Sequence, residues 1–336
     1  MRAIVQTRYG PHHQVLRAGE IPQPVAGPGQ VLVRVRATSV HADVWHAVTG
    51  VPLVLRLMGS GVRVPKQPVP GTDLAGEVVA VQASAGVAPG DRVFGEVTSR
   101  NQWANAGTFA EYAAVDAGLL ARIPDHLSFE QAAAVPTTAL IALMNLRDQA
   151  RIRSGQRVLV NGAAGGVGVW AVQLAKVFGA QVTAVDAPAK LDLLRELGAD
   201  QVIDYTRQDF TELGTRYDLV FDIVSQAPFA RVRRALEPDG TYVMIGHDQY
   251  GSSGRRVLGS LGRMLPLMAV SPMVKQLPGI RPARPRDEHW AELVELLAAG
   301  RIRPVVDERS FPLEQAVLAI DHLMTGTAQG RVVLTV

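Results

Sequence analysis

Asn161-Gly162-Ala163-Ala164-Gly165-Gly166-Val167-Gly168 is the stretch that decides the fold of this chain. It follows a short apolar segment, Arg157 to Val160, that has the composition of a strand. It opens into Val167 to Phe178, where apolar residues recur on a helical period. Small residues in such a turn let the backbone approach a pyrophosphate, and the N–H groups and dipole of the helix attract its charge. We therefore expect dinucleotide binding by Gly162, Ala163, Ala164, Gly165, Gly166, Val167 and Gly168, with a tight turn that binds nothing as the alternative.

The same alternation of strand and helix continues beyond this turn. Short apolar runs are separated by helical patterns, which predicts an α/β fold with a doubly wound parallel Rossmann sheet. The expected strands are residues 181–185, 201–203, 218–224 and 241–245, the expected helices are 189–197 and 229–236, and 238–240 is an expected turn.

The first 125 residues have a different pattern. Short strands, at 31–35, 76–81, 91–95 and 109–115, are punctuated by Pro-Gly, Gly-Asp and Gly-Thr pairs, which predicts an antiparallel, β-rich domain. The tail combines a helical segment, 313–324, with a last strand, 331–336, and is expected to return to this domain. We thus predict one domain of residues 1–125 and 301–336 and a nucleotide-binding domain of residues 126–300.

The composition excludes several classes of protein. Hydrophobic residues make up 47% of the chain and charged residues 19%, as in an ordinary globular protein. A net charge of +3 and scattered aromatic residues argue against nucleic acid as the partner. We see no apolar run of about 18 residues and no signal segment, so we expect a cytoplasmic protein without a membrane partner. The chain has no cysteine, which removes disulfides and thiolate metal ligands.

Motifs along the whole chain carry a family resemblance. Pro70 to Val78, Gly90 to Gly95 and Gly107 to Tyr112 resemble segments of the medium-chain dehydrogenase/reductases. Gln131 to Ala139, Leu197 to Asp200 and Gly330 to Leu334 resemble later segments of that family, in the same order. The chain looks like the zinc-free, quinone oxidoreductase branch. The resemblance implies a GroES-like catalytic domain, an NAD(P)H-dependent activity and a homodimer.

Asp186 ends the second strand of the nucleotide-binding domain, roughly 20 residues beyond the glycines. A carboxylate there accepts hydrogen bonds from the ribose hydroxyls of NAD and repels a 2′-phosphate, which favours NADH. Lys190 conflicts with this reading, because NADP-dependent relatives often place a basic residue near this turn. Asp186 could instead cap the helix that starts near Ala189. The cofactor is therefore expected to be NADH or NADPH, with NADH favoured, and we also assign Tyr205, Ile245 and Gly246 to its site.

The resemblance also bears on metal chemistry. Zinc-dependent members use Cys and His ligands at positions that here hold Val40, Thr72 and an apolar helix near Pro136. His41, Asp43 and His46 offer an alternative set of nitrogen and oxygen ligands, but these residues more simply line a polar pocket or cap a helix. We expect no metal. Without a Lewis acid, hydride is best delivered to a quinone, an enone or another activated C=C bond, whose distant oxygen takes up the charge.

Three residues are assigned to the catalytic site: His41, Asp43 and Thr138. Quinone oxidoreductases commonly carry Asn where this chain has His41, close to the nicotinamide. His41 could donate a proton or a hydrogen bond, and a neutral pocket histidine with a binding role is the alternative. The resemblance implies that Thr138 contacts the carboxamide of the nicotinamide, and its alternative is a hydroxyl bonded to its own helix.

Two apolar segments, 51–58 and 257–273, are unusual for connections. They could wall a pocket for a small lipophilic substrate, pack in the core or a dimer, or, for the second, lie on a membrane surface. Two other functions remain open at this point. One is a zinc-independent alcohol dehydrogenase or carbonyl reductase, and the other is a nucleotide-binding protein without turnover.

Overall fold

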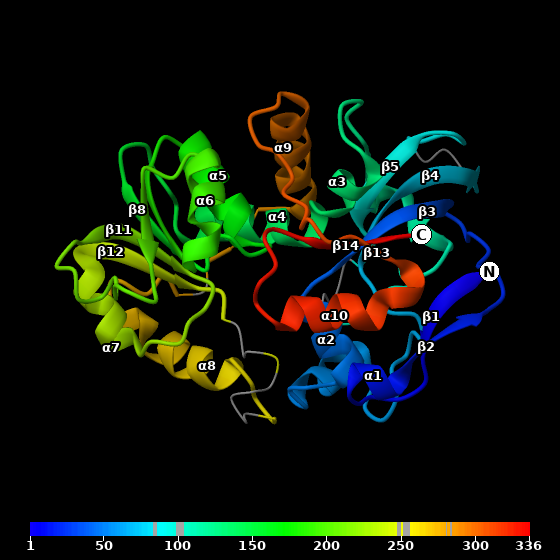
Figure 1. Cartoon of the computed structure of the whole chain (residues 1–336), viewed down its shortest axis with the longest axis horizontal. Helices are drawn as coiled ribbons and strands as arrows, with labels where there is room; N and C mark the ends of the chain where they lie inside the picture. Colours follow the sequence, from blue (N-terminus) through cyan, green and yellow to red (C-terminus); the bar gives the residue numbers. More distant parts are fainter. Residues whose placement is uncertain (83–85, 99–103, 247–249, 251–255, 280, 283) are drawn as a thin grey trace. The chain divides into compact units, whose positions relative to one another are not determined.

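The computed structural model describes residues 1–82, 86–98, 104–246, 250, 256–279, 281–282 and 284–336 (Figure 1). They form two compact units. The first consists of Met1–Thr137, Gln249–Gly259 and Pro304–Val336, and the second consists of Thr138–Asp248 and Ser260–Arg303.

The second unit is built on a parallel five-stranded sheet with the order β10-β9-β8-β11-β12. On one side of β8, the chain adds β9 and then β10 towards the edge of the sheet. On the other side of β8 lies β11, and β12 follows it at the opposite edge. Right-handed crossovers then require helices on both faces. Figure 1 shows α5 and α6 on one side of the sheet and α7 and α8 on the other, so the doubly wound fold is confirmed. The strands are β8 Arg157–Asn161, β9 Gln181–Asp186, β10 Gln201–Asp204, β11 Tyr217–Asp222 and β12 Leu236–Met244; the helices are α5 Gly168–Val177, η4 Pro188–Lys190, α6 Leu191–Glu196, α7 Phe229–Val232, η5 Arg233–Ala235, α8 Leu261–Val270, η6 Ser271–Met273 and α9 Arg286–Ala298.

The sequence predicted a turn at residues 238–240 before a strand at residues 241–245, and this prediction is wrong. β12 runs from Leu236 to Met244 without a break. Its register against β11 shifts, because Tyr217 pairs with Leu236 whereas Leu219 pairs with Thr241. The Pro-Asp-Gly sequence therefore forms an irregularity inside a strand. Such an irregularity has the same local composition as a turn.

The first unit contains a seven-stranded sheet with the order β13-β14-β3-β4-β5-β7, and β6 also pairs with β3. The C-terminal β14 pairs antiparallel with β3, which brings the tail into the same sheet as the N-terminal segment. The strands are β1 Arg2–Gln6, β2 Leu16–Glu20, β3 Gln30–Val40, β4 Asp73–Val81, β5 Arg92–Glu96, β6 Tyr112–Asp116, β7 Leu120–Arg122, β13 Phe311–Pro312 and β14 Val332–Thr335. The helices are α1 His12–Val15, α2 Ala42–Thr49, η1 Arg56–Ser60, η2 Ala117–Leu119, α3 Phe129–Ala133, η7 Leu313–Gln315 and α10 Ala316–Met324, while α4 Pro136–Met144 and η3 Asn145–Gln149 lead into the second unit.

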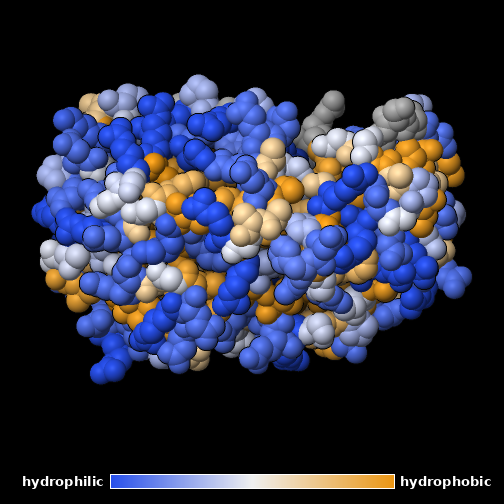
Figure 2. Space-filling view, turned by 90° about the horizontal axis from the view of Figure 1, so that it is seen from above, coloured by the Kyte–Doolittle hydropathy of each residue, from blue (hydrophilic) through white to orange (hydrophobic). Residues whose placement is uncertain are grey.

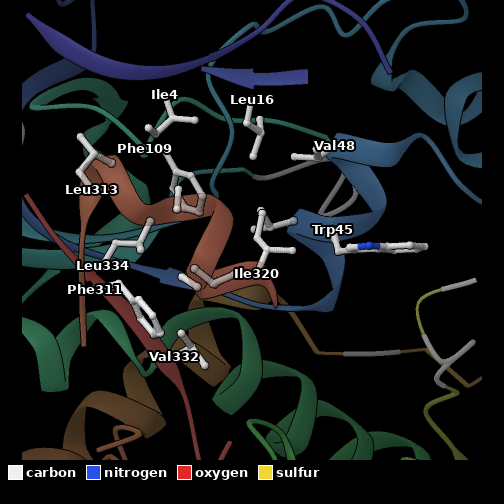
Figure 3. Close-up of a cluster of buried hydrophobic side chains, with 14 of the residues drawn as sticks. Ile4, Leu16, Trp45, Val48, Phe109, Phe311, Leu313, Ile320, Val332 and Leu334 are labelled. Atoms are coloured by element: carbon white, nitrogen blue, oxygen red, sulfur yellow. The ribbon is translucent and has the colours of Figure 1, made fainter. Parts of the chain in front are cut away.

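A hydrophobic core fixes α2 and α10 to this sheet. Phe109, Ile320 and Val48 lie in it, and Trp45 lies at its margin on α2 (Figure 3). Burial of each large apolar side chain contributes about 1.5–3 kcal/mol, so this cluster holds the start of α2 in a fixed place. That matters because His41 directly precedes α2.

The two apolar segments differ in burial. In the first, Leu55 is buried, whereas Leu57 and Met58 are exposed. None of the residues of α8, within the second segment, is fully buried, but the half-buried Leu267 packs against the core of the second unit. Figure 2 shows, on one face, apolar residues scattered between hydrophilic ones. Among the described residues, none of the helices is long and apolar enough to cross a membrane.

Candidate functional site

The glycine-rich turn joins β8 to α5, as the sequence predicted, and it is tied to the end of β9. The N–H groups of Gly162 and Ala163 donate to the carbonyl of Val185, at 3.0 and 3.1 Å. Ala163 and Ala164 are fully buried, so they hold the loop in place. The accessible part of the turn is 165–167, directly before the N-terminal turn of α5, whose first N–H groups have no partner within the helix.

The surroundings of Gly168 and Gly165, both in the turn, differ in how much space they leave for a side chain. A Cβ on Gly168 would lie 2.2 Å from the carbonyl oxygen of Gly162 and 2.5 Å from the backbone of Ala163, so glycine is required for packing. Among the described residues, a Cβ on Gly165 would meet nothing closer than 3.6 Å, which is an ordinary van der Waals distance. Gly165 is also half-exposed, and the small residues of the turn fit a pyrophosphate group.

The carboxylate of Asp186 is held by the backbone. One oxygen accepts the N–H of Ala164 and the other accepts the N–H of Ala187, both at 2.8 Å. Lys190 Nζ lies 3.8 Å from the second oxygen, and both side chains are almost completely buried. Asp186 caps neither of the helices that follow, because Ala187 is the N-cap of η4 and Lys190 is that of α6. A carboxylate has about four acceptor positions, so Asp186 keeps room for a further hydroxyl, but its charge is partly compensated.

The other residues assigned to the cofactor lie at the same edge of the sheet. Tyr205 follows β10 and is exposed, and its N–H donates to the carbonyl of Asp186 at 3.3 Å. Ile245 and Gly246 follow β12 and are half-buried. The turn follows β8 and Asp186 ends β9, so the parallel strands bring all these residues to their common carboxyl edge, where such sheets bind nucleotides.

Asp222, which ends β11, was missed by the sequence analysis. It is fully buried and accepts hydrogen bonds from Asn161 Nδ2 at 2.8 Å, the Ser225 N–H at 2.8 Å and the Tyr242 hydroxyl at 2.9 Å. Burial raises the pKa of this carboxyl, although these donors oppose the shift. Burial and the neighbouring Asp222 also raise the pKa of Tyr242. Asp222 thus anchors the start of the glycine-rich turn, and the available signal was an acid that ends a strand, as Asp186 does.

His41 lies between β3 and α2 and is buried. Its Nε2 lies 2.8 Å from the Thr72 hydroxyl, and its Nδ1 lies 3.4 Å from Asp43 Oδ2. Nδ1 has no hydrogen-bond partner among the described residues. The backbone carbonyl of His41 begins α2, but its side chain caps nothing. Both ring nitrogens therefore face protein groups of the same unit.

Asp43 and His46 do not complete a cluster around His41. Burial raises the pKa of the Asp43 carboxyl, but the contact with His41 and the positive charges of the nearby basic groups lower it more, so the pKa lies below its usual value. His46 points elsewhere, because its Nδ1 donates to the carbonyl oxygen of Val51 at 2.5 Å. Thr138, the third residue assigned to catalysis, is buried in α4 and belongs to the second unit.

Comparisons with known proteins agree over the whole chain. Residues 27–125 match the family described as "Alcohol dehydrogenase GroES-like domain", and residues 197–334 match the one described as "Zinc-binding dehydrogenase". A 2-methylene-furan-3-one reductase of Solanum lycopersicum is 34% identical, over 99% of this chain and 79% of that protein. The chloroplastic quinone-oxidoreductase QR1 of Triphysaria versicolor is 31% identical, over 99% and 98% of the two chains. The crystal structure of Escherichia coli quinone oxidoreductase complexed with NADPH has a TM-score of 0.79 and 26% identity, with both chains completely covered.

One of the family descriptions names zinc, but the residues of this chain offer few ligands for it. The chain has no cysteine, and Thr72 and Val40 stand at the positions expected for ligands. Across the described ranges, no three His, Asp or Glu side chains gather as a metal site requires. The donor set of this chain does not fit a zinc centre.

Proposed function

The chain belongs to the zinc-free medium-chain dehydrogenase/reductase family, and we propose that it reduces a quinone, an enone or another activated C=C bond with a nicotinamide cofactor. The observation that carries the proposal is the half-exposed turn of small residues, 165–167, at the N-terminus of α5, in a chain whose relatives are named as reductases of such acceptors. The bound cofactor supplies a hydride. The residues of the chain bind it and stabilise the charge that develops on the acceptor oxygen.

The proposed role of His41 follows from its contacts. Its Nε2 is hydrogen-bonded to the Thr72 hydroxyl, and its Nδ1 lies 3.4 Å from Asp43 Oδ2 without a hydrogen bond, which favours a role other than proton donation. We assign His41 as a positioning residue that orders the start of α2, and we propose that water supplies the proton that completes the reduction.

The choice of coenzyme follows from the environment of Asp186. Its charge disfavours a 2′-phosphate, but Lys190 compensates part of that charge at 3.8 Å, and one relative is solved with NADPH. These effects oppose each other, and we propose that NADH and NADPH are accepted with similar kcat/KM.

The experiment is oxidation of NADH and of NADPH, followed by absorbance, with a quinone, an enone and a saturated ketone offered in parallel. Turnover with the two conjugated acceptors and none with the ketone is expected. Turnover of the ketone, or oxidation of a simple secondary alcohol, would overturn the substrate class in favour of an alcohol dehydrogenase. Cofactor binding without turnover of any acceptor would overturn the enzymatic function.

A further inference from the structure

A pocket of about 500 Å³ lies entirely within the first unit, beside α2. Its volume is in the range of small-molecule sites. Its walls come from α1, α2, the segment after α2, α10 and residues near Tyr250, and they include Trp45, Leu53 and Met324. Nothing in the proposed function so far uses this pocket.

The walls are mainly apolar and aromatic. Trp45 is nearly buried and packs edge to face against Tyr250, with ring centroids 5.6 Å apart. Leu53 continues the wall, and its N–H donates to the carbonyl of Arg256 at 2.8 Å, which ties the two segments together. Trp45 and Thr49 are four residues apart on α2, so they lie on the same face of this helix, and both line the pocket.

The charged groups on the pocket wall are all basic. Arg56 and Arg256 line it, together with His12 and His13, and no Asp or Glu is among its described lining residues. One of these side chains, His12, contacts a carboxylate outside the lining, because its Nε2 lies 2.7 Å from Asp321 Oδ1.

Arg56 is held in place without being neutralised. Its guanidinium donates to the carbonyls of Gly50 and Thr49, at 2.9 and 3.4 Å, and lies 4.4 Å from the centroid of the Tyr9 ring. In the part of the chain that the structure describes, neither Arg56 nor Arg256 forms an ion pair with a carboxylate. Two uncompensated guanidinium groups beside an apolar wall fit an anionic group at the end of an apolar chain.

We propose that the acceptor is an amphiphile, with an apolar chain against Trp45, Leu53 and Met324 and an anionic end, carboxylate or phosphate, on Arg56 and Arg256. This rests on the proposed function for the reaction itself. Arg56 follows the C-terminal end of α2, and its guanidinium contacts the carbonyls of Gly50 and Thr49, whereas His41 precedes the N-terminal end of this eight-residue helix. In the proposed acceptor, the activated C=C bond and the anionic group therefore lie at opposite ends of the apolar chain.

The first test is binding, measured by calorimetry below micelle concentrations, with dodecanoate, dodecyl phosphate, dodecanol and dodecyltrimethylammonium as probes. The two anions are expected to bind at least tenfold more tightly than the alcohol, and the ammonium not measurably; the stronger anion identifies the head group. Arg256→Gln should weaken only the anions, and Arg17→Gln, an exposed arginine of β2 away from the pocket, should change nothing. Equal binding of alcohol and anions, or unchanged anion binding by Arg256→Gln and Arg56→Gln, would overturn the proposal. Because Arg56 also supports the Gly50 carbonyl, Arg256→Gln is the decisive variant.

The second test compares turnover of an enone that ends in a carboxylate with turnover of its methyl ester. Arg256→Gln is expected to raise KM for the acid about tenfold, to leave its kcat unchanged, and to leave both constants unchanged for the ester. If both acceptors respond alike, the anion site is wrong although the proposed function stands. If the anionic probes bind as expected but no acceptor is reduced, the proposed function fails and the pocket remains a lipid-anion site.

Discussion

Arg331 donates a hydrogen bond from Nη2 to Asp73 Oδ2 at 2.6 Å, although 258 positions separate the two residues. Both side chains are almost completely buried. Ser39 donates to the same carboxylate oxygen, and Thr137 donates to the other, at 2.5 Å. The pair therefore joins the starts of β4 and β14 to β3, beside the segment that carries His41.

Arg331→Met should lower the free energy of unfolding by about 3–5 kcal/mol, because it leaves the buried charge of Asp73 without its partner. The measurement is urea denaturation followed by circular dichroism. Arg303→Ala, which removes an exposed pair with Glu196, is the control and should leave the midpoint almost unchanged. A midpoint equal to that of the control would mean that the remaining hydrogen bonds are sufficient for Asp73.

Asp186→Asn is expected to raise kcat/KM for NADPH relative to NADH by about tenfold, because it removes the charge that repels a 2′-phosphate while keeping an acceptor oxygen. Lys190→Ala should shift the ratio in the opposite direction. The measurement is kcat/KM for both coenzymes. Asp192→Asn changes a highly exposed acid nearby and serves as the control. An unchanged ratio in both test variants would show that Asp186 only holds the backbone of the turn.

His41→Asn should keep kcat within about tenfold and leave the shape of the pH–rate profile unchanged, because a positioning residue can be replaced by another hydrogen-bonding side chain. His41→Ala should instead raise KM for the acceptor through disorder at the start of α2. General acid catalysis by His41 predicts a different result for both variants, namely a fall in kcat of about 10²–10⁴ and loss of one limb of the profile.

Asp43→Asn tests the lowered pKa of this carboxyl. A group whose pKa is lower in the folded state stabilises the protein above its unfolded pKa, and this stability is lost as the pH falls through the folded value. Asp43→Asn should therefore be less stable than the wild type at neutral pH, and the difference should shrink as the pH falls below the usual value of 3.8. Urea denaturation at several pH values measures it. A difference that is constant over this range would assign the loss to packing alone.

Local patterns in the sequence predicted most of the elements of the fold. The spacing of apolar residues and the glycines predicted β8, the turn and α5 within about a residue, because these features depend on neighbours along the chain. The contact between Arg331 and Asp73 depends on residues far apart in sequence, and no periodicity reports it. Pro238 to Gly240 shows the reverse case, in which turn-forming residues were incorporated into a strand by its pairing with β11.

The sequence predicted which residues belong to the candidate site, but it did not predict the contacts that their side chains make. Asp186 was found from its distance to the glycines, yet its hydrogen bonds to Ala164 and Ala187 become visible only in three dimensions. In the same way, the sequence offered His41, Asp43 and His46 as one group. The structure shows that the His46 ring donates to the carbonyl oxygen of Val51.

In the glycine-rich turn, one glycine is expected to serve ligand binding and another to serve packing, so substitutions only three residues apart can separate the two roles. Gly165→Ala adds a methyl group that meets no described atom closer than 3.6 Å, so thermal unfolding should be unchanged while the dissociation constant for the cofactor rises at least tenfold, or about 1.4 kcal/mol. Gly168→Ala adds the same group within 2.2 Å of a backbone oxygen, so it should lower the free energy of unfolding by about 1–3 kcal/mol. Calorimetric titration with NADH and NADPH and a thermal melt of each variant measure these affinities and stabilities. Unchanged cofactor affinity in a well-folded Gly165→Ala protein would mean that the pyrophosphate does not lie over this turn, and the assignment of the cofactor site would have to be abandoned.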